Sequence, residues 1–217
     1  MKNKKFLGPV RNGALCLGLP LALALAAGVP NAVAAPVIFT TQLSGAVEAP
    51  PNSSPGTGSA VVTLDTATHQ LDVSFTFSGL LGTTAAAHIH CCTALPGLGV
   101  APVATQLPTF SGFPLGVTSG SYTSTFDTLL PSTYNPNFVT ANGGSTAAAE
   151  AALLAGMTAG LSYLNLHTSE FPGGEIRGFL TPVAVPEPAS MGILGVGIAG
   201  LALARRRRRS ASKQLVG

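Results

Sequence analysis

The side chains best suited to chemistry in this sequence are three histidines and the polar residues that accompany them. Alternate residues of a β-strand point to the same face of a sheet, so His88 and His90 share one face of a candidate strand. In a second candidate strand, His167 shares a face with two other polar residues. A third candidate strand presents an acid and an arginine on one face. If these strands are neighbours, one polar face carries His88, His90, Tyr163, Asn165, His167, Glu175 and Arg177.

Two interpretations of this polar face stay open. In the first, the neutral imidazoles of the three histidines bind a copper or zinc ion, since both metals accept imidazole nitrogen. In the second, the same residues form a hydrogen-bonded lattice, in which Glu175 pairs with Arg177 or a histidine and Asn165 braces a loop. A two-metal site of the superoxide dismutase kind would also need His69 as a fourth copper ligand.

The N-terminal end is typical of a secretory signal peptide. Four basic residues precede an apolar run from Ala14 to Val29, and small residues follow. We expect a helical signal segment over residues 1–34 and cleavage by signal peptidase before Ala35. The mature chain therefore starts outside the cytoplasm.

The C-terminal end predicts a membrane anchor. Residues 183–188 form a linker, and the apolar residues 189–204 would span roughly 24 Å as a helix, a little less than the hydrocarbon core of about 30 Å. Positive charge beside a membrane segment stays on the cytoplasmic side, so residues 205–217 are expected to be a cytoplasmic tail. The residues that stop transfer are Arg205, Arg206, Arg207, Arg208 and Arg209.

The motif Pro186-Glu187-Pro188, followed by the apolar stretch and the arginines, resembles the PEP-CTERM sorting signal. The resemblance implies that an exosortase-type transpeptidase processes the chain near this motif. It also implies a transient anchor in the membrane, and then a place on the cell surface or in the extracellular matrix.

Cys91 and Cys92 are the two cysteines of the mature chain. An oxidising compartment outside the cytoplasm favours disulfides. We expect first a vicinal disulfide between them, second a thiolate metal ligand from Cys92, which shares the histidine face, and third disulfides to another chain.

Charge excludes nucleic acid as a partner of the mature domain. The chain has a formal net charge of +3, but ten of its 11 Lys and Arg residues lie in the signal peptide or after Ala204. Arg177 remains among seven acids, and neutralising phosphates requires clustered basic residues. Residues 35–182 suit one domain, rich in Thr, Ser, Gly and Pro, which favours an antiparallel all-β fold.

Alternation of apolar and polar residues predicts seven strands, the second and third of which form a hairpin. A Pro- and Gly-rich loop over residues 92–116 is expected to be long and exposed. One short helix is expected over residues 146–154, capped by Ser145 or Thr146 and ended by Gly156. The expected strands are 36–43, 58–65, 71–77, 85–91, 120–128, 161–168 and 174–181.

Three segments of the polar face resemble the signature of the chordin-type (CHRD) domain: Ala87 to His90, Tyr163 to Thr168, and Phe171 to Gly178. The likeness covers roughly residues 40 to 180. It implies a Greek-key β-sandwich of immunoglobulin-like or superoxide-dismutase-like kind, in a family whose bacterial members have no settled activity.

These observations predict a non-enzymatic protein of the cell surface or matrix, whose domain binds a metal or a partner such as a matrix polysaccharide or surface protein. The chain has no Gly-x-Ser-x-Gly elbow, phosphate loop or His-Glu-x-x-His helix. The alternative is a secreted copper or zinc redox protein similar to superoxide dismutase.

Overall fold

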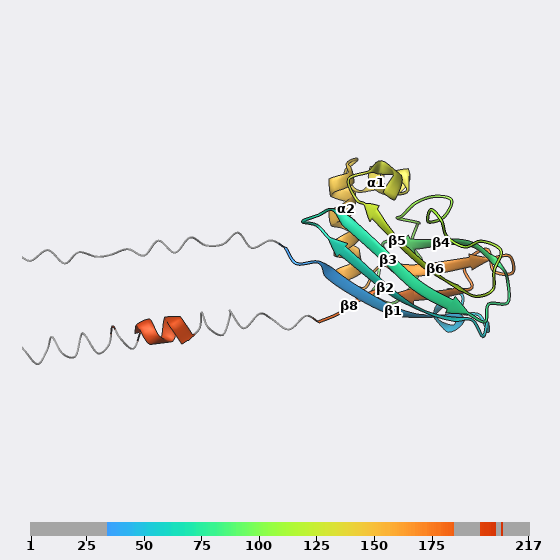
Figure 1. The fold of residues 1–217 in the computed structure, drawn as a ribbon, viewed down its shortest axis with the longest axis horizontal. Helices are drawn as coiled ribbons and strands as arrows, with labels where there is room; N and C mark the ends of the chain where they lie inside the picture. Colours follow the sequence, from blue (N-terminus) through green and yellow to red (C-terminus); the bar gives the residue numbers. More distant parts are fainter. Residues whose placement is uncertain (1–33, 185–195, 203–204, 206–217) are drawn as a thin grey trace, which may run out of the picture. The chain divides into compact units, whose positions relative to one another are not determined.

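A computed structural model describes residues 34–184, 196–202 and 205 of the chain. Residues 34–184 form a β-rich domain (Figure 1). Its strands are β1 (Val37–Ser44), β2 (Thr57–Asp65), β3 (Gln70–Ser78), β4 (Thr84–His90), β5 (Gly120–Asp127), β6 (Tyr163–Thr168), β7 (Ile176–Phe179) and β8 (Thr181–Pro182). Its helices are α1 (Pro136–Ala141), α2 (Thr146–Thr158) and two 3₁₀ turns, η1 (Gly45–Val47) and η2 (Pro131–Thr133).

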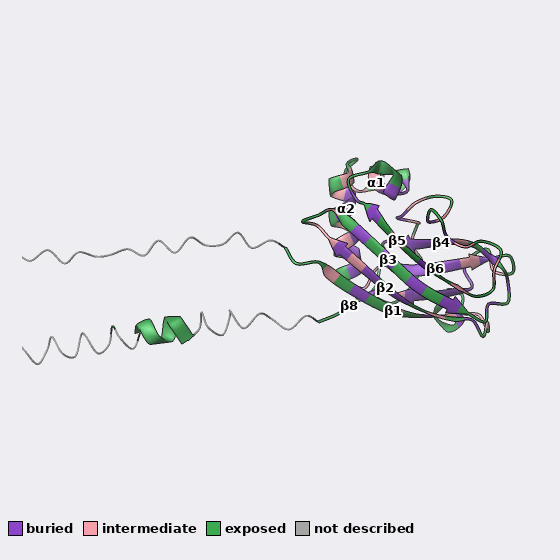
Figure 2. Cartoon of the chain, in the orientation of Figure 1, coloured by how far each residue is buried: buried purple, intermediate pink, exposed green. Residues whose placement is uncertain are grey.

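Side-chain alternation explains the first half of the fold. In β3, every second residue from Leu71 to Phe77 is buried, and the residues between them are exposed (Figure 2). β2 and β3 pair as an antiparallel hairpin in which Val62 lies opposite Val73. The predicted hairpin is confirmed, because a strand with one apolar face is stable when that face meets a core.

All strands are antiparallel to their neighbours, and one hydrogen-bonded path connects them in the order β4-β6-β7-β1-β2-β3-β5, with β8 on β1. The sheet curls, so that β4 and β6 lie behind β2, β3 and β5 in the view of Figure 1. The all-β antiparallel prediction is confirmed. The immunoglobulin-like or superoxide-dismutase-like Greek-key topology stays a prediction, and the hydrogen bonds show one continuous curled sheet.

Strands β4 and β6 separate the hydrophobic core from the histidines. Ala87 and Ile89 of β4 and Leu164 and Leu166 of β6 join the single hydrophobic core. The residues between them therefore point to the opposite face. This face carries His88 and His90 of β4 and His167 of β6, and loop carbonyls contact all three rings.

Two helices are present where one was expected. α1 has the cap Asn135, whose side chain accepts a hydrogen bond from the Asn137 N–H. Ser145, one of the two predicted caps, is the N-cap of α2. The helix does not end at Gly156, as was predicted, but continues to Thr158. The glycine has another role, because a β-carbon at Gly156 would collide with the sulfurs of Cys91 and Cys92. It allows these sulfurs to pack closely against the helix.

The loop between β4 and β5 is long, but the prediction that it is exposed is wrong for part of it. Ala104, Thr105, Phe110 and Phe113 are buried. The N–H groups of Ala104 and Phe110 donate to β4 carbonyls, so the loop covers the free edge of that strand. Exposed apolar residues remain elsewhere in the loop, such as Leu107.

The predicted terminal segments fall largely outside the described residues. The motif Pro186-Glu187-Pro188 lies there entirely, as do residues 1–33 of the predicted signal peptide, and residues 189–204 lie there in part. Residues 196–202 are helical. Among the described residues, no helix combines the length and apolar character needed to cross a membrane. The transmembrane segment therefore stays a prediction.

Candidate metal centre

Strand pairing brings three imidazoles together on the outer face of β4 and β6. The register places Ala86 opposite His167 and His88 opposite Asn165. The ring centroids of His88 and His90 are 5.8 Å apart, and His167 lies 5.2 Å from the first and 5.7 Å from the second. One ring nitrogen from each histidine lies within 4.8 Å of those of the other two. We call these three residues the histidine group.

Backbone carbonyls fix the tautomer of each imidazole. Nε2 of His88 lies 2.7 Å from the Pro108 carbonyl, Nδ1 of His90 lies 2.9 Å from that of Ala101, and Nδ1 of His167 lies 2.9 Å from that of Pro172. A carbonyl oxygen accepts hydrogen bonds, so these nitrogens must carry the protons. The other nitrogen of each ring, Nδ1 of His88 and Nε2 of the other two, keeps its lone pair.

These three lone-pair nitrogens are buried without a hydrogen-bond partner among the described residues. Leaving a buried polar atom unpaired costs about 1 to 3 kcal/mol, so such atoms are uncommon in folded proteins. Three of them in one group of side chains match the arrangement of metal-binding histidines, in which one nitrogen ligates and the other donates to a carbonyl.

Burial keeps the histidine group neutral. It lowers the pKa of His88 to about 4, partly offset by the Pro108 hydrogen bond, and the pKa of His90 to about 4, partly offset by the Ala101 hydrogen bond. Burial also lowers the pKa of His167. At neutral pH the rings therefore carry the unprotonated nitrogens that a metal ion needs.

Tyr163 braces His90 from the neighbouring strand. The two rings stack with centroids 4.8 Å apart and an interplanar angle of 8°. The Tyr163 hydroxyl accepts from the Ala101 N–H at 3.1 Å, and the Ala101 carbonyl accepts the His90 proton. Ala101 of the loop between β4 and β5, which we call the covering loop, thus bonds to both side chains. These contacts fix the orientation of the His90 ring.

Arg177 continues this stack. Its guanidinium carbon lies 4.7 Å from the centre of the Tyr163 ring. Its Nε donates to the Val47 carbonyl at 2.6 Å and its terminal nitrogen to that of Gly99 at 2.9 Å. Arg177 therefore connects the covering loop to the segment after β1.

Arg177 is paired with Glu48, which was not among the predicted site residues. Its Nε lies 3.7 Å from Oε2 of Glu48, and both side chains are buried. Burial raises the pKa of Glu48 to about 7, although the charge of Arg177 and the Ala49 N–H oppose the rise. The acid and the arginine are far apart in the sequence, so no local pattern indicated the pair.

Glu175 is not the partner of Arg177 or of a histidine, contrary to the lattice expected from alternation. Its carboxylate accepts from the Leu81 N–H at 2.6 Å and from the Thr168 hydroxyl at 2.7 Å, and it has further donors in Ser54 and Gly82. Burial raises its pKa, but these hydrogen bonds outweigh the burial and lower it. Glu175 therefore ties the segment before β2, the β3–β4 loop and the end of β6 together at the start of β7.

Asn165 lies between the histidines and Arg177 in the strand register. Its amide nitrogen donates to the Gly173 carbonyl at 3.4 Å, which is the loop contact that the sequence predicted. A β-carbon at Gly174, whose φ is 129°, would lie 2.5 Å from the Asn165 amide. A glycine is therefore needed for the loop to approach this strand.

Cys91 and Cys92 are joined in a disulfide. Their sulfurs pack against Gly156 of α2, and they line a pocket with Phe138 of α1. Cys92 is not one of the residues that the structure brings together as a possible metal group. Both sulfurs are used in this bond, so the thiolate ligand and the disulfides to another chain stay predictions.

His69 also lies apart from the histidine group. It occupies the turn between β2 and β3, where its Nδ1 lies 3.0 Å from Oε2 of Glu150 in α2. The superoxide dismutase arrangement would require it beside the other three. The structure therefore does not assemble that four-histidine copper site.

The carbonyls that orient the rings could not be found from motifs. Ala101 and Pro108 belong to the covering loop, and Pro172 belongs to the turn before β7. The two phenylalanines at 110 and 113 were the available signal that this loop packs on the domain.

Comparison with known proteins identifies two segments. The model of the CHRD domain matches residues 39–180, and that of the PEP-CTERM protein-sorting motif matches residues 184–209. The second match indicates export and processing of a membrane-anchored precursor by an exosortase-type system. No curated protein and no solved structure matches the chain. Since the first match spans well over half of the sequence, the chain belongs to the CHRD domain family.

Proposed function

We propose that this exported protein is a non-enzymatic component of the cell surface or extracellular matrix whose domain binds one transition metal ion, zinc or copper. The ligands are Nδ1 of His88 and Nε2 of His90 and His167. The observation that carries the proposal is the presence of three buried, unprotonated nitrogens in one group, each on a ring oriented by a carbonyl.

The geometry is compatible with one ion. Nitrogens bound to a common zinc ion at about 2.0 to 2.1 Å lie roughly 3.3 Å apart in tetrahedral geometry. The group's nitrogens lie within 4.8 Å, so small ring rotations bring them into range. The ligand set is neutral and contains no carboxylate, which suits zinc and copper better than calcium or magnesium.

A bound ion would stabilise the domain by joining strands β4 and β6 beneath the covering loop. It would remove the unpaired nitrogens and use the orientation that Tyr163 already gives to His90. The redox alternative is not favoured by a specific observation, since the fourth histidine lies with Glu150.

The test is metal analysis of the purified segment 35–182, which contains every residue of the core. We expect zinc or copper at about one ion per chain by mass spectrometry of metals, and a rise in melting temperature on adding the metal to the stripped protein. Replacement of all three histidines by glutamine should remove both effects. His69→Gln is the matched control and should keep them.

Absence of stoichiometric zinc or copper, together with no thermal shift on addition, would overturn the proposal. Retention of metal by the triple variant would mean that other residues are the ligands. Superoxide dismutation by the metal-loaded protein would contradict the non-enzymatic part.

A further inference from the structure

The free edge of β5 is open for pairing with another strand. The Thr128 N–H donates to the His69 carbonyl, and these residues continue the β3–β5 register. In an antiparallel pair, residues alternate between hydrogen-bonded and non-hydrogen-bonded positions. The backbone groups of Phe126, Ser124 and Tyr122 therefore face β3, whereas those of the residues between them face away.

The outward backbone groups belong to Ser121, Thr123 and Thr125. No backbone hydrogen bond from these three residues to a segment other than β3 is present in the described part of the chain. Their side chains are exposed as well. By contrast, the other end of the sheet, β4, is covered by the loop that follows it. The sheet thus has one edge that is blocked and one that is not.

The β5 edge lacks the features that normally prevent pairing. Strand edges are protected by lysine, proline, bulges or very short length. β5 is eight residues long, reads GSYTSTFD, and pairs with β3 without a register shift. Its single charge, Asp127, is at the end, where the carbonyl already accepts from the Leu130 N–H.

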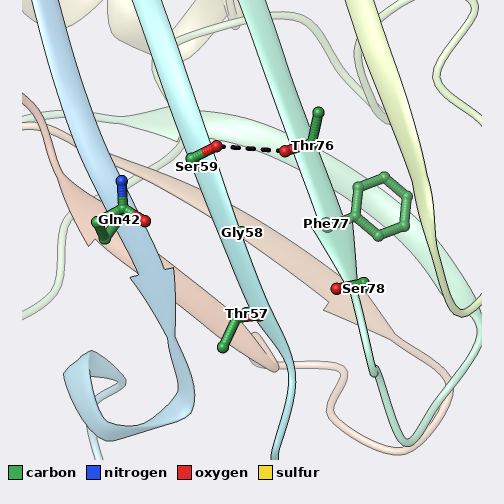
Figure 3. A pocket seen from close by; sticks show the side chains of 7 residues that line it. All are labelled: Gln42, Thr57, Gly58, Ser59, Thr76, Phe77 and Ser78. Carbon is green, nitrogen blue, oxygen red and sulfur yellow. Dashed lines mark hydrogen bonds between the residues drawn. The ribbon is translucent and has the colours of Figure 1, made fainter.

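The outer face of the sheet shows what the next strand should present. Hydroxyl side chains meet across neighbouring strands: Ser59 lies 3.2 Å from Thr76, and Ser74 lies 3.0 Å from Thr123. Figure 3 shows the first of these pairs among the side chains that line a shallow pocket on β1, β2 and β3. A further strand that carries hydroxyls at alternate positions would continue this pattern.

We infer that the β5 edge is a self-association site, at which a second copy of this chain adds its own β5 in antiparallel orientation about a two-fold axis at Thr123. This register pairs the outward backbone groups of Thr123 with those of the partner's Thr123, and those of Ser121 with the partner's Thr125. Hydroxyls meet hydroxyls, as they do between β3 and β5.

Charge favours a second copy at this edge over an anionic partner. Between residues 34 and 184 the one Lys or Arg is Arg177, which is buried, so no basic side chain of this range is available to hold an anion. In the proposed register each Asp127 lies opposite the partner's Ser119, which is uncharged, so no two like charges face each other across the pair.

The experiment introduces a cysteine at the two-fold axis of the full chain, displayed on the producing cells. Hydrogen-bonded positions place Cα atoms about 5.5 Å apart, within the range that a disulfide bridges. Thr123→Cys should give a species of twice the chain's mass on a non-reducing gel, which disappears on reduction. Thr76→Cys, equally exposed but on β3, whose two edges are both paired, should remain monomeric.

A second pair of variants tests the role of the backbone. Thr125→Pro removes an outward N–H without touching the β3 ladder, and in the Thr123→Cys chain it should reduce the cross-linked fraction at least tenfold. Thr125→Ala keeps the N–H and loses only a hydroxyl, so it should lower the cross-linked fraction by about twofold at most.

Equal cross-linking of Thr123→Cys and Thr76→Cys would overturn the inference, as would a Thr123→Cys chain that reaches the surface but stays monomeric under oxidant. Cross-linking of Thr123→Cys to a protein of different mass would assign the edge to another partner and reject self-association.

Discussion

His88 and His90 make the stability of the metal-free domain depend on pH. Their pKa values are about 4 in the fold, because burial disfavours the charged form, against 6.5 when exposed. The unfolded chain therefore binds more protons between pH 6.5 and pH 4. As pH falls through this window, the free energy of unfolding should fall by up to about 3 kcal/mol for each histidine and then level off.

Urea denaturation of the metal-free segment 35–182, from about pH 7.5 to about pH 4, measures this effect. The His88→Gln and His90→Gln double variant is the reference, since it keeps other titrating groups. Glu48 has the opposite sign: its raised pKa favours the folded state at low pH, and this contribution is lost as pH rises through about 7. An unchanged pH dependence in the double variant would show that the histidines are not responsible.

Gly156 is a second residue whose identity follows from one close contact. Alanine is a better helix former by about 1 kcal/mol, yet its β-carbon would collide with the sulfurs of Cys91 and Cys92. Overpacking costs about 1 to 3 kcal/mol, so after the helix gain is subtracted Gly156→Ala should lower the free energy of unfolding by up to about 2 kcal/mol.

A double-mutant cycle separates these two effects. In a chain in which Cys91 and Cys92 are both alanine, Gly156→Ala should become much less destabilising or stabilising, because the collision with the sulfurs is gone, the contact with the Ser162 hydroxyl at 3.0 Å is milder, and the helix preference remains. If Gly156→Ala is equally destabilising in both backgrounds, the close contact with the sulfurs is not the reason for the glycine.

At the scale of elements, the start of α2 depends on one side chain. The sequence offered two candidate N-cap residues, Ser145 and Thr146. In the structure the Ser145 hydroxyl accepts a hydrogen bond from the Ala148 N–H. Removing an N-cap costs about 1 kcal/mol, so Ser145→Ala should lower the free energy of unfolding by that amount. Thr146→Ala, at the first helical residue, should leave it unchanged or raise it slightly. Thermal or urea denaturation of the two variants distinguishes them, and equal losses would contradict the assignment.

Elements with strong periodicity were predicted well from the sequence. β3 alternates along its whole length, and its predicted and observed bounds differ by one residue at each end. α1 has both an asparagine cap and a proline at its first position, but six residues are too few for a helical period to emerge. The buried part of the loop over 92–116 was missed because glycine and proline masked its two phenylalanines.

In the candidate site, too, the features that depend on local periodicity were predicted and the others were not. Alternation placed the histidines on one face of paired strands, since that depends on local period and strand order alone. It failed for Glu175, because Gly174 has a φ of 129° and the residues before β7 do not continue its alternation. The Glu48 partner of Arg177 depends on the curl of the whole sheet, which a local pattern does not contain.

At the scale of the whole molecule, the charges of the chain divide into separate regions. Its basic residues gather at the two ends, and the one within the domain is buried with Glu48. The folded part therefore presents carboxylates and hydroxyls, while the C-terminal end carries the sorting motif. This division predicts that sorting and folding can be changed independently.

Replacing Pro186-Glu187-Pro188 by three alanines should test that independence. The family match covers this motif, which marks the chain for an exosortase-type system. Without it, we expect the precursor to stay in the membrane fraction, held by the apolar residues 189–204 and the arginines after them, with the domain still folded and exported. Immunoblots of membrane and extracellular fractions, in a host that contains the processing system, measure the outcome.

Val183→Ser is the matched control, because it changes the linker next to the domain and leaves the motif intact. It should be processed and released like the parent chain. The histidine triple variant should also be processed normally, since its changes lie within the domain. If the alanine variant is released at the parent rate, the motif is not what the processing system recognises, and the anchor is removed by another route.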